Sequence, residues 1–141
     1  VLYAAGRAGE RFGVRNSGAF AVVEGLGDHG CEYMTGGIML ILGQTGRNFG
    51  AGMTGGRAYV LDQEGVFEKR VNLELVQLER LEGQTDIANV RTFLERHFVA
   101  TQSNRALEVL TNWDDFQELF WMVVPRGSGA KLEQAVSAKE G

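Results

Sequence analysis

Cysteine, proline and histidine are all scarce in this chain of 141 residues. Its one cysteine, Cys31, excludes an internal disulfide, and a cytoplasmic location is expected. Lysine and arginine number 14 against 18 aspartates and glutamates, a net charge of -4, and no basic stripe is interleaved with aromatic residues. Nucleic-acid binding is therefore not indicated. No apolar run approaches the roughly 18 residues of a membrane span, so none is predicted.

Glycine, in contrast, is abundant, with 20 residues, most of them in the first half of the chain. Many belong to a motif that is written twice. Met34-Thr35-Gly36-Gly37 returns 19 residues later as Met53-Thr54-Gly55-Gly56, and Arg15-Asn16-Ser17-Gly18 stands one interval earlier as a weaker copy. A fixed period of this length is typical of solenoid proteins, in which each repeat stacks on the next.

Four apolar runs fall on the same period. They are Val1 to Ala5, Phe20 to Glu24, Met39 to Gly43 and Ala58 to Asp62. Aligned on the period, they place Tyr3, Val22, Ile41 and Val60 in one column, with Ala4, Val23, Leu42 and Leu61 in the next. The pattern predicts a mainly β fold, a right-handed single-stranded β-helix with rungs of about 19 residues and parallel, in-register strands. A leucine-rich solenoid is the alternative, but its Leu-x-x-Leu-x-Leu pattern is absent.

Glycine residues in matching columns are expected to form the corners of the coils, where the chain needs positive φ or close backbone approach. The predicted corner glycines are Gly18, Gly25, Gly27, Gly36, Gly37, Gly46, Gly55 and Gly56. Both alternating faces of the strands are apolar. One face is expected to fill the interior of the coil and the other to be covered by helices or by a partner domain.

The sequence divides into a β-helix over residues 1–72, a helical part over 73–125 that packs on it, and a flexible tail over 126–141. The predicted elements after the repeat follow from local signals. They begin with a turn at 62–65, a short extension or hairpin of Val66-Phe67 with Val71-Asn72, and an alternating strand or helical turn at 73–78. A helix then runs from N-cap Thr85 to about Val99, and a second from N-cap Ser103 to near Trp113. A helical turn at 116–120 and an apolar run at 121–124, which Pro125 ends, complete the series.

Val1 lies inside a predicted strand and no polar capping repeat precedes it. We therefore expect the chain to be a segment of a longer polypeptide. An uncapped rung also allows a homodimer through the end of the β-helix.

Chemical motifs are few. Gly25-Leu26-Gly27-Asp28-His29-Gly30 matches Gly-x-Gly-x-x-Gly, but no helix has room to begin there, so corner glycines are the preferred interpretation. His29 and Cys31, with Asp28 and Glu32, could form a metal site or a reactive thiol, yet no second cluster supplies further ligands. His97 is interpreted as a helix residue that contacts the solenoid. Arg47, Arg57 and the acidic residues around them are interpreted as a solvated or interface surface. No catalytic, cofactor-binding or metal residue is predicted.

The segments Gly27 to Gly37 and Leu42 to Gly56 closely resemble the C-terminal Gly-x-Gly-x-Gly domain of the glutamate synthase large subunit. The likeness runs from about Leu2 to Pro125 and includes the His97-x-x-x-Thr101-x-Ser103 connection between helices. It implies a structural domain of an oxidoreductase that moves the amide nitrogen of glutamine, as ammonia, onto 2-oxoglutarate.

The resemblance further implies FMN and a three-iron cluster in other domains of the parent enzyme, with electrons from NADPH or ferredoxin, and none of these cofactors in this segment. The implied partners are the other domains of the large subunit. The β-helix would hold the glutaminase and synthase domains in position for ammonia channelling. The alternative is a free-standing β-helix subunit, or a binding and assembly module of a multi-subunit oxidoreductase.

Overall fold

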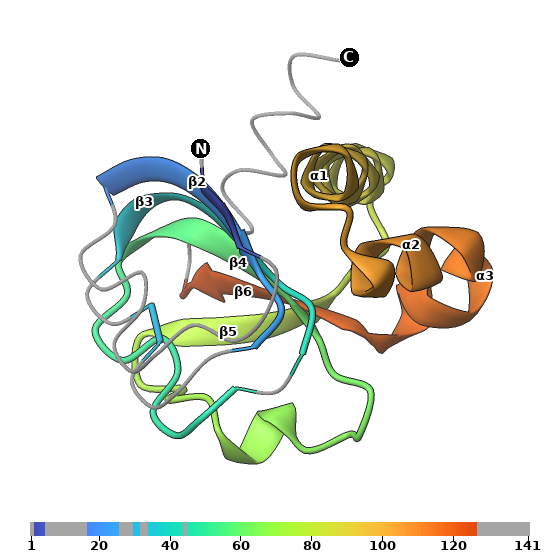
Figure 1. Cartoon of the computed structure of the whole chain (residues 1–141). Helices are drawn as coiled ribbons and strands as arrows, with labels where there is room; N and C mark the ends of the chain where they lie inside the picture. The colour runs from blue at the N-terminus through green and yellow to red at the C-terminus, as the bar shows by residue number, and fades with distance from the viewer. Residues whose placement is uncertain (1, 5–16, 26–29, 32–33, 44, 127–141) are drawn as a thin grey trace, which may run out of the picture.

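The computed structural model describes residues 2–4, 17–25, 30–31, 34–43 and 45–126. Those residues form six strands, three α-helices and two 3₁₀ helices (Figure 1). In chain order the elements are β1 (Leu2–Ala4), β2 (Ser17–Val23), β3 (Thr35–Ile41), β4 (Gly55–Leu61), η1 (Phe67–Lys69), β5 (Val76–Arg80), α1 (Gln84–Thr101), α2 (Asn104–Thr111), α3 (Trp113–Phe116), η2 (Gln117–Leu119) and β6 (Phe120–Pro125). The predicted tail lies, from residue 127 on, outside the described residues.

All six strands join one sheet, in the order β1-β2-β3-β4-β6-β5. The four apolar runs of the repeat supply β1 to β4, and each pairs in parallel with the next. β6 pairs antiparallel with both β4 and β5. The prediction of a chain built on stacked parallel strands, followed by helices, is confirmed. A closed β-helix with 19-residue rungs is not confirmed, because the described strands form an open, mixed sheet.

The predicted register holds at two of the three parallel interfaces and is wrong at one. Tyr3 pairs with Val22, and Ile41 with Val60, as the repeat requires. Between β2 and β3, however, Val22 pairs with Leu40, one residue short of the repeat interval. Side chains alternate between the two faces of a strand. This shift therefore places Val22 on the same face as Leu40, and not on the face of Ile41 as the predicted columns require.

The shift occurs where the glycines of the repeated motif lie. In β2, Gly18 and Ala19 stand opposite a single residue of β3, Gly37. One strand further on, Gly36 and Gly37 of β3 stand opposite Gly56 of β4. Gly37 and Gly56 have φ angles of 85° and 79°, a left-handed conformation that side chains with a Cβ rarely adopt. The repeated glycines therefore accompany β-bulges that lie side by side in neighbouring strands.

Both faces of the parallel strands are buried, as predicted. One face packs against the segments that connect the strands, and this cluster includes Ala21, Val23, Met39, Ile41, Ala58, Val60, Cys31, Met34, Phe49, Met53 and Phe67. The other face packs against the helices, and this cluster includes Val22, Leu40, Leu42, Tyr59, Leu61, Val90, Leu94, Ala106, Val109, Trp113 and Phe116. Figure 1 shows α1, α2 and α3 gathered on one side of the sheet. The expectation that helices cover one apolar face is confirmed.

Two predictions after β4 are corrected by the structure and one is confirmed. Of the short extension or hairpin predicted at 66–72, the hairpin alternative is wrong, because η1 occupies this segment and Val71 bridges to Phe49, between β3 and β4. Helix α1 begins after an extended Gly83 rather than after Thr85, which already lies in its first turn. Ser103 is the N-cap of α2, as predicted, and its hydroxyl accepts a hydrogen bond from the Ala106 amide at 3.1 Å.

The remaining boundaries differ by a few residues. Helix α2 ends at Thr111, and Trp113 opens the separate short helix α3. The alternating segment at 73–78 becomes strand only from Val76, and the apolar run before Pro125 belongs to β6. Among the described helices, none combines the length and apolar character that crossing a membrane requires.

The close approach of β3 and β4 makes Gly55 a test of the fold. A Cβ atom built on Gly55 would overlap the main-chain carbonyl of Thr35, and the main chain cannot move aside without breaking the strand pairing. We expect Gly55→Ala to lower the free energy of unfolding by about 3 kcal/mol, measured by urea denaturation. Gly83→Ala is the control, because a Cβ there meets only an Asp86 carboxylate oxygen at 3.5 Å. Equal stability of the two variants would contradict the close-approach interpretation.

Candidate functional site

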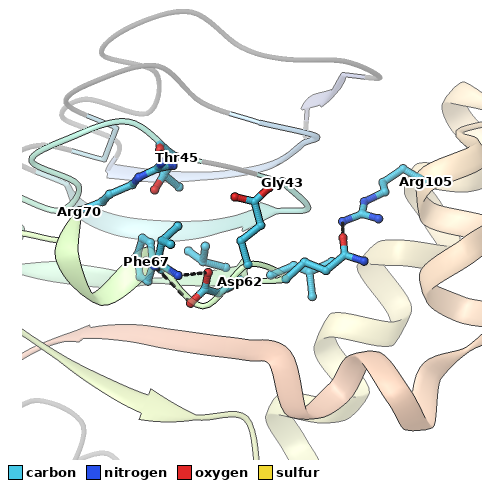
Figure 2. A pocket seen from close by; sticks show the side chains of 11 residues that line it. Gly43, Thr45, Asp62, Phe67, Arg70 and Arg105 are labelled. Carbon is cyan, nitrogen blue, oxygen red and sulfur yellow. Dashed lines mark hydrogen bonds between the residues drawn. The ribbon is translucent and has the colours of Figure 1, made fainter.

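A cavity of about 210 Å³ lies between the loop after β3, the turn after β4 and the start of α2 (Figure 2). Its described lining combines apolar residues such as Val60, Leu61 and Val66 with charged ones such as Asp62, Arg70 and Arg105. The lining residues are Gly43, Thr45, Val60, Leu61, Asp62, Gln63, Glu64, Val66, Phe67, Arg70 and Arg105. Figure 2 shows Thr45 and Arg70 together at one end of the cavity and Arg105 at the other.

The turn that forms the floor is held by Asp62. Its Oδ1 accepts a hydrogen bond from the Val66 amide at 3.0 Å, and its Oδ2 accepts from the Phe67 amide and from Trp121 Nε1, both at 3.2 Å. Gly65 adopts a φ of 73° within this turn. The sequence predicts the turn itself, but not that its aspartate also ties it to β6.

Arg105 closes the other end of the cavity. Its Nε donates to the carbonyl of Leu42 at 3.0 Å, one terminal nitrogen donates to Gln63 Oε1 at 2.6 Å, and the other to Glu108 Oε1 at 2.7 Å. These bonds join α2 to the ends of β3 and β4. With all three nitrogens occupied, Arg105 acts as a fixed connection between helix and sheet.

The opposite end pairs Arg70 with Thr45. One terminal nitrogen of Arg70 donates to the main-chain carbonyl of Thr45 at 2.6 Å. The side chain of Thr45 is 3% exposed, and its Oγ1 has no hydrogen-bond partner in the described structure. A buried hydroxyl without a partner is uncommon in folded proteins.

A polar contact ties the helices to β2 away from the cavity. Glu24, immediately after β2, accepts hydrogen bonds through Oε2 from His97 Nε2 at 3.0 Å and from the Ser103 hydroxyl at 2.7 Å. His97 is fully buried in α1, and Ser103 caps α2. The prediction that His97 contacts the sheet is confirmed, whereas the sequence did not identify Glu24 as its partner.

A second polar contact ties the start of α1 to β4. Asp86 Oδ1 accepts from the Tyr59 hydroxyl at 2.6 Å and also from the Arg57 guanidinium. Burial, with the bond to Asp86, raises the pKa of Tyr59. Burial is the largest single influence on the pKa of Arg57 and lowers it, but the charges and hydrogen bonds of Asp86 and Tyr59 together outweigh burial, so the pKa is raised. Arg57, predicted at a solvated or interface surface, is 21% exposed and pairs with Asp86, a partner that the sequence did not identify.

The predicted corner glycines lie at several kinds of position. Gly18, Gly36, Gly37, Gly55 and Gly56 stand within strands, Gly25 follows β2, Gly46 lies in the loop after β3, and Gly27 is outside the described residues. Among those described, Gly37 and Gly56 have positive φ, and Gly55 approaches the neighbouring main chain. Their role as corners of a closed coil stays a prediction.

The candidate thiol and metal residues divide between described and undescribed positions. Asp28, His29 and Glu32 lie outside the described residues, while Cys31 is fully buried in the cluster beneath the sheet. Within the described part of the chain, no three His, Cys, Asp or Glu side chains gather closely enough to hold a metal ion. Cys31 therefore belongs to no group of three such ligands among those residues.

The Glu24 contact should contribute to stability. Replacing Glu24 with alanine removes the acceptor of the buried His97 and of the Ser103 hydroxyl. We expect Glu24→Ala to lower the free energy of unfolding by about 2 to 3 kcal/mol, measured by urea denaturation, because both donors lose their partner. Glu118→Ala is the control at an exposed position. A loss no larger than that of the control would show that the contact does not hold the helices.

Burial should also make Cys31 unreactive. Burial raises the pKa of the Cys31 thiol from 9.0 to about 12, so very little thiolate exists in the folded chain at pH 8. We expect an aromatic disulfide reagent to label the unfolded chain fully and the folded chain hardly at all. Since the folded-state pKa is the higher one, this thiol's contribution to stability is complete below pH 9 and declines as the pH rises toward 12. Fast labelling of the folded chain at pH 8 would contradict this.

Comparison with known proteins adds to this geometry. A family model for the GXGXG motif matches residues 1–126. The NADPH glutamate synthase large chain of Bacillus subtilis (strain 168) is 50% identical over 125 residues, which cover 88% of this chain and 8% of that protein. Ferredoxin-dependent glutamate synthases of Pyropia yezoensis and of Spinacia oleracea, the latter chloroplastic, are 50% and 48% identical over 124 residues, with the same coverage.

The chain thus spans less than a tenth of the length of these relatives. The matched region contains the parallel strands, the repeated glycines and all of the described helices. Because the family model covers nearly the whole chain, this protein belongs to the GXGXG motif family, and its relatives named here are glutamate synthases.

Proposed function

We propose that this chain is a structural domain of a glutamate synthase large subunit. In this proposal it holds the glutaminase domain and the FMN and iron–sulfur synthase domain in position, so that ammonia from glutamine reaches 2-oxoglutarate. Two sites that share an unstable intermediate need a fixed separation, and a stiff domain between them provides it. The other domains of the same polypeptide are the proposed partners, and the cytoplasm is the proposed location.

The observation that carries the proposal is the way the sheet is fixed on both sides. One apolar face is buried under the connecting segments and the other under the helices. Three polar contacts then attach the helices to the sheet. Glu24 binds at the end of β2, Asp86 binds to β4, and Arg105 binds at the end of β3. Such packing resists both sliding and rotation of the layers, because each movement would separate a buried donor from its acceptor.

The finer proposal is that β1 to β4 are rungs of a right-handed β-helix. Contacts between successive coils outside the sheet support it. The amide of Gly50 donates to the carbonyl of Gly30 at 2.9 Å, and that of Thr54 to the carbonyl of Met34 at 2.9 Å. Phe49 forms a parallel bridge with Val71. Successive coils therefore stack along their returning segments as well as along the strands.

The cofactors of the proposed parent enzyme are placed in its other domains. An iron–sulfur cluster is held by several cysteine thiolates, and this chain has a single cysteine, which is buried. The residues present therefore do not fit such a cluster, and no step of the reaction is assigned to them.

Coupling between the two activities tests the proposal. In the full-length enzyme, Glu24→Gln keeps the shape of the side chain but removes the charge that holds His97 and Ser103. We expect glutamine hydrolysis to continue while the share of ammonia incorporated into glutamate falls at least twofold. The measurement compares free ammonia released with glutamate formed from labelled 2-oxoglutarate.

Glu118→Gln is the matched control, because this glutamate is exposed. A thermal unfolding scan of both variants shows whether the domain is loosened. Normal coupling in a Glu24→Gln enzyme whose domain melts earlier would contradict the structural role. A common loss of all activities, without leakage of ammonia, would contradict it as well.

A further inference from the structure

Two exposed leucines lie just before β5 and form a small apolar surface, the leucine patch. Leu73 and Leu75 are 42% and 43% exposed, and neither belongs to the two apolar clusters of the described residues. A single exposed leucine is ordinary on a protein surface. Two of them two residues apart present an apolar area that burial under another segment would stabilise.

The last described residue is attached to this patch. The main-chain amide of Arg126 donates to the carbonyl of Leu75 at 2.8 Å, and its Nε donates to the carbonyl of Leu73 at 2.9 Å. Pro125, the last residue of β6, comes directly before it. The polypeptide that follows Arg126 therefore starts against the main chain of both leucines.

The amino-acid sequence that follows suits an apolar patch at this place. Gly127-Ser128-Gly129 is a flexible link that allows the chain to turn back. Residues 130–139 are mostly good helix formers, and Leu132, Ala135 and Val136 recur at the spacing of three and four that gives a helix one apolar face. A helix this short is marginal in water, so it needs a surface to pack on.

The dimensions and charges of the two surfaces agree. On a helix, Leu132 and Val136 would have Cβ atoms about 6 Å apart, while two Cα atoms two residues apart, as in the leucine patch, are separated by at most about 7 Å. Glu74 stands between the two leucines, and Lys139 would lie on the apolar face of the helix at its far end. The three-residue link keeps the local concentration of the segment high, which compensates for a small contact area.

We propose that residues 130–139 form a short amphipathic helix that packs back on the leucine patch, with Leu132 and Val136 against Leu73 and Leu75. The packed helix would replace the flexible tail that composition alone predicts. The match to the GXGXG family model ends at residue 126, so this contact goes beyond the structural role proposed above and does not depend on it.

Amide hydrogen exchange in the full-length protein tests the contact. In the wild type we expect the amides of residues 131–139 to exchange about tenfold or more slowly than those of an unstructured peptide of the same sequence. We expect Leu75→Ser and Leu132→Ser each to remove this protection. Leu107→Ser is the control for the patch, because Leu107 is 45% exposed but lies in α2. Gln134→Ser is the control for the segment, because a helix would place Gln134 opposite its apolar face.

A second measurement identifies what lies on the leucine patch. With photoreactive benzoylphenylalanine in place of Leu73, we expect irradiation to cross-link this position to residues 130–139 of the same chain, as mass spectrometry of the peptides would show. Capture of a different segment or of a second copy, or no capture at all, would overturn the proposal. Exchange of residues 131–139 at the unstructured rate in the wild type would overturn it too, as would equal protection in Leu75→Ser and Leu107→Ser.

Discussion

Direct contact between the main chains of successive parallel strands is the constraint on which the rest of this structure depends. At Gly55 the backbone lies against the carbonyl of Thr35, and at Gly43 it lies against the carbonyl of Glu24, so that neither position has room for a Cβ atom. The spacing of the parallel strands is thereby set by the backbone itself. Side chains then have to fill the two faces that this spacing leaves, and both faces are apolar.

The polar contacts between helices and sheet follow from that arrangement. A layer of helices on an apolar surface is held by a force without direction, and it could settle in more than one orientation. Hydrogen bonds to Glu24 and Asp86 give the contact a direction, because each carboxylate must meet two particular donors. Burial of these donors makes an alternative orientation costly. In this way the hydrophobic effect supplies the attraction and a few polar groups select the geometry.

The sequence predicts those features that are encoded locally or by the repeat. The four parallel strands follow from the period, and the cap at Ser103 follows from the chemistry of helix ends. The register between β2 and β3 does not follow from the period, because Gly18 and Ala19 form a bulge that the period cannot reveal. The antiparallel place of β6 is equally hidden, since its partner β4 lies about 60 residues earlier in the chain.

The candidate site was invisible in the sequence for a related reason. Thr45, Asp62 and Arg105 come from three separate segments, and no motif in the sequence groups the three together. An isolated threonine beside a glycine-rich turn looks like any other loop residue until its burial is known. Two acidic residues at the ends of apolar strands, Glu24 after β2 and Asp62 after β4, do offer a signal, because a carboxylate in such a position needs partners.

The antiparallel strand β6 also gives the sheet a polarity. β4 has its outer edge occupied by a strand running the other way, so the parallel series cannot grow past it. Among the described strands, β1 is the other border of the parallel series. The described series therefore extends in one direction only, away from β4, and the antiparallel β6 fixes where it stops.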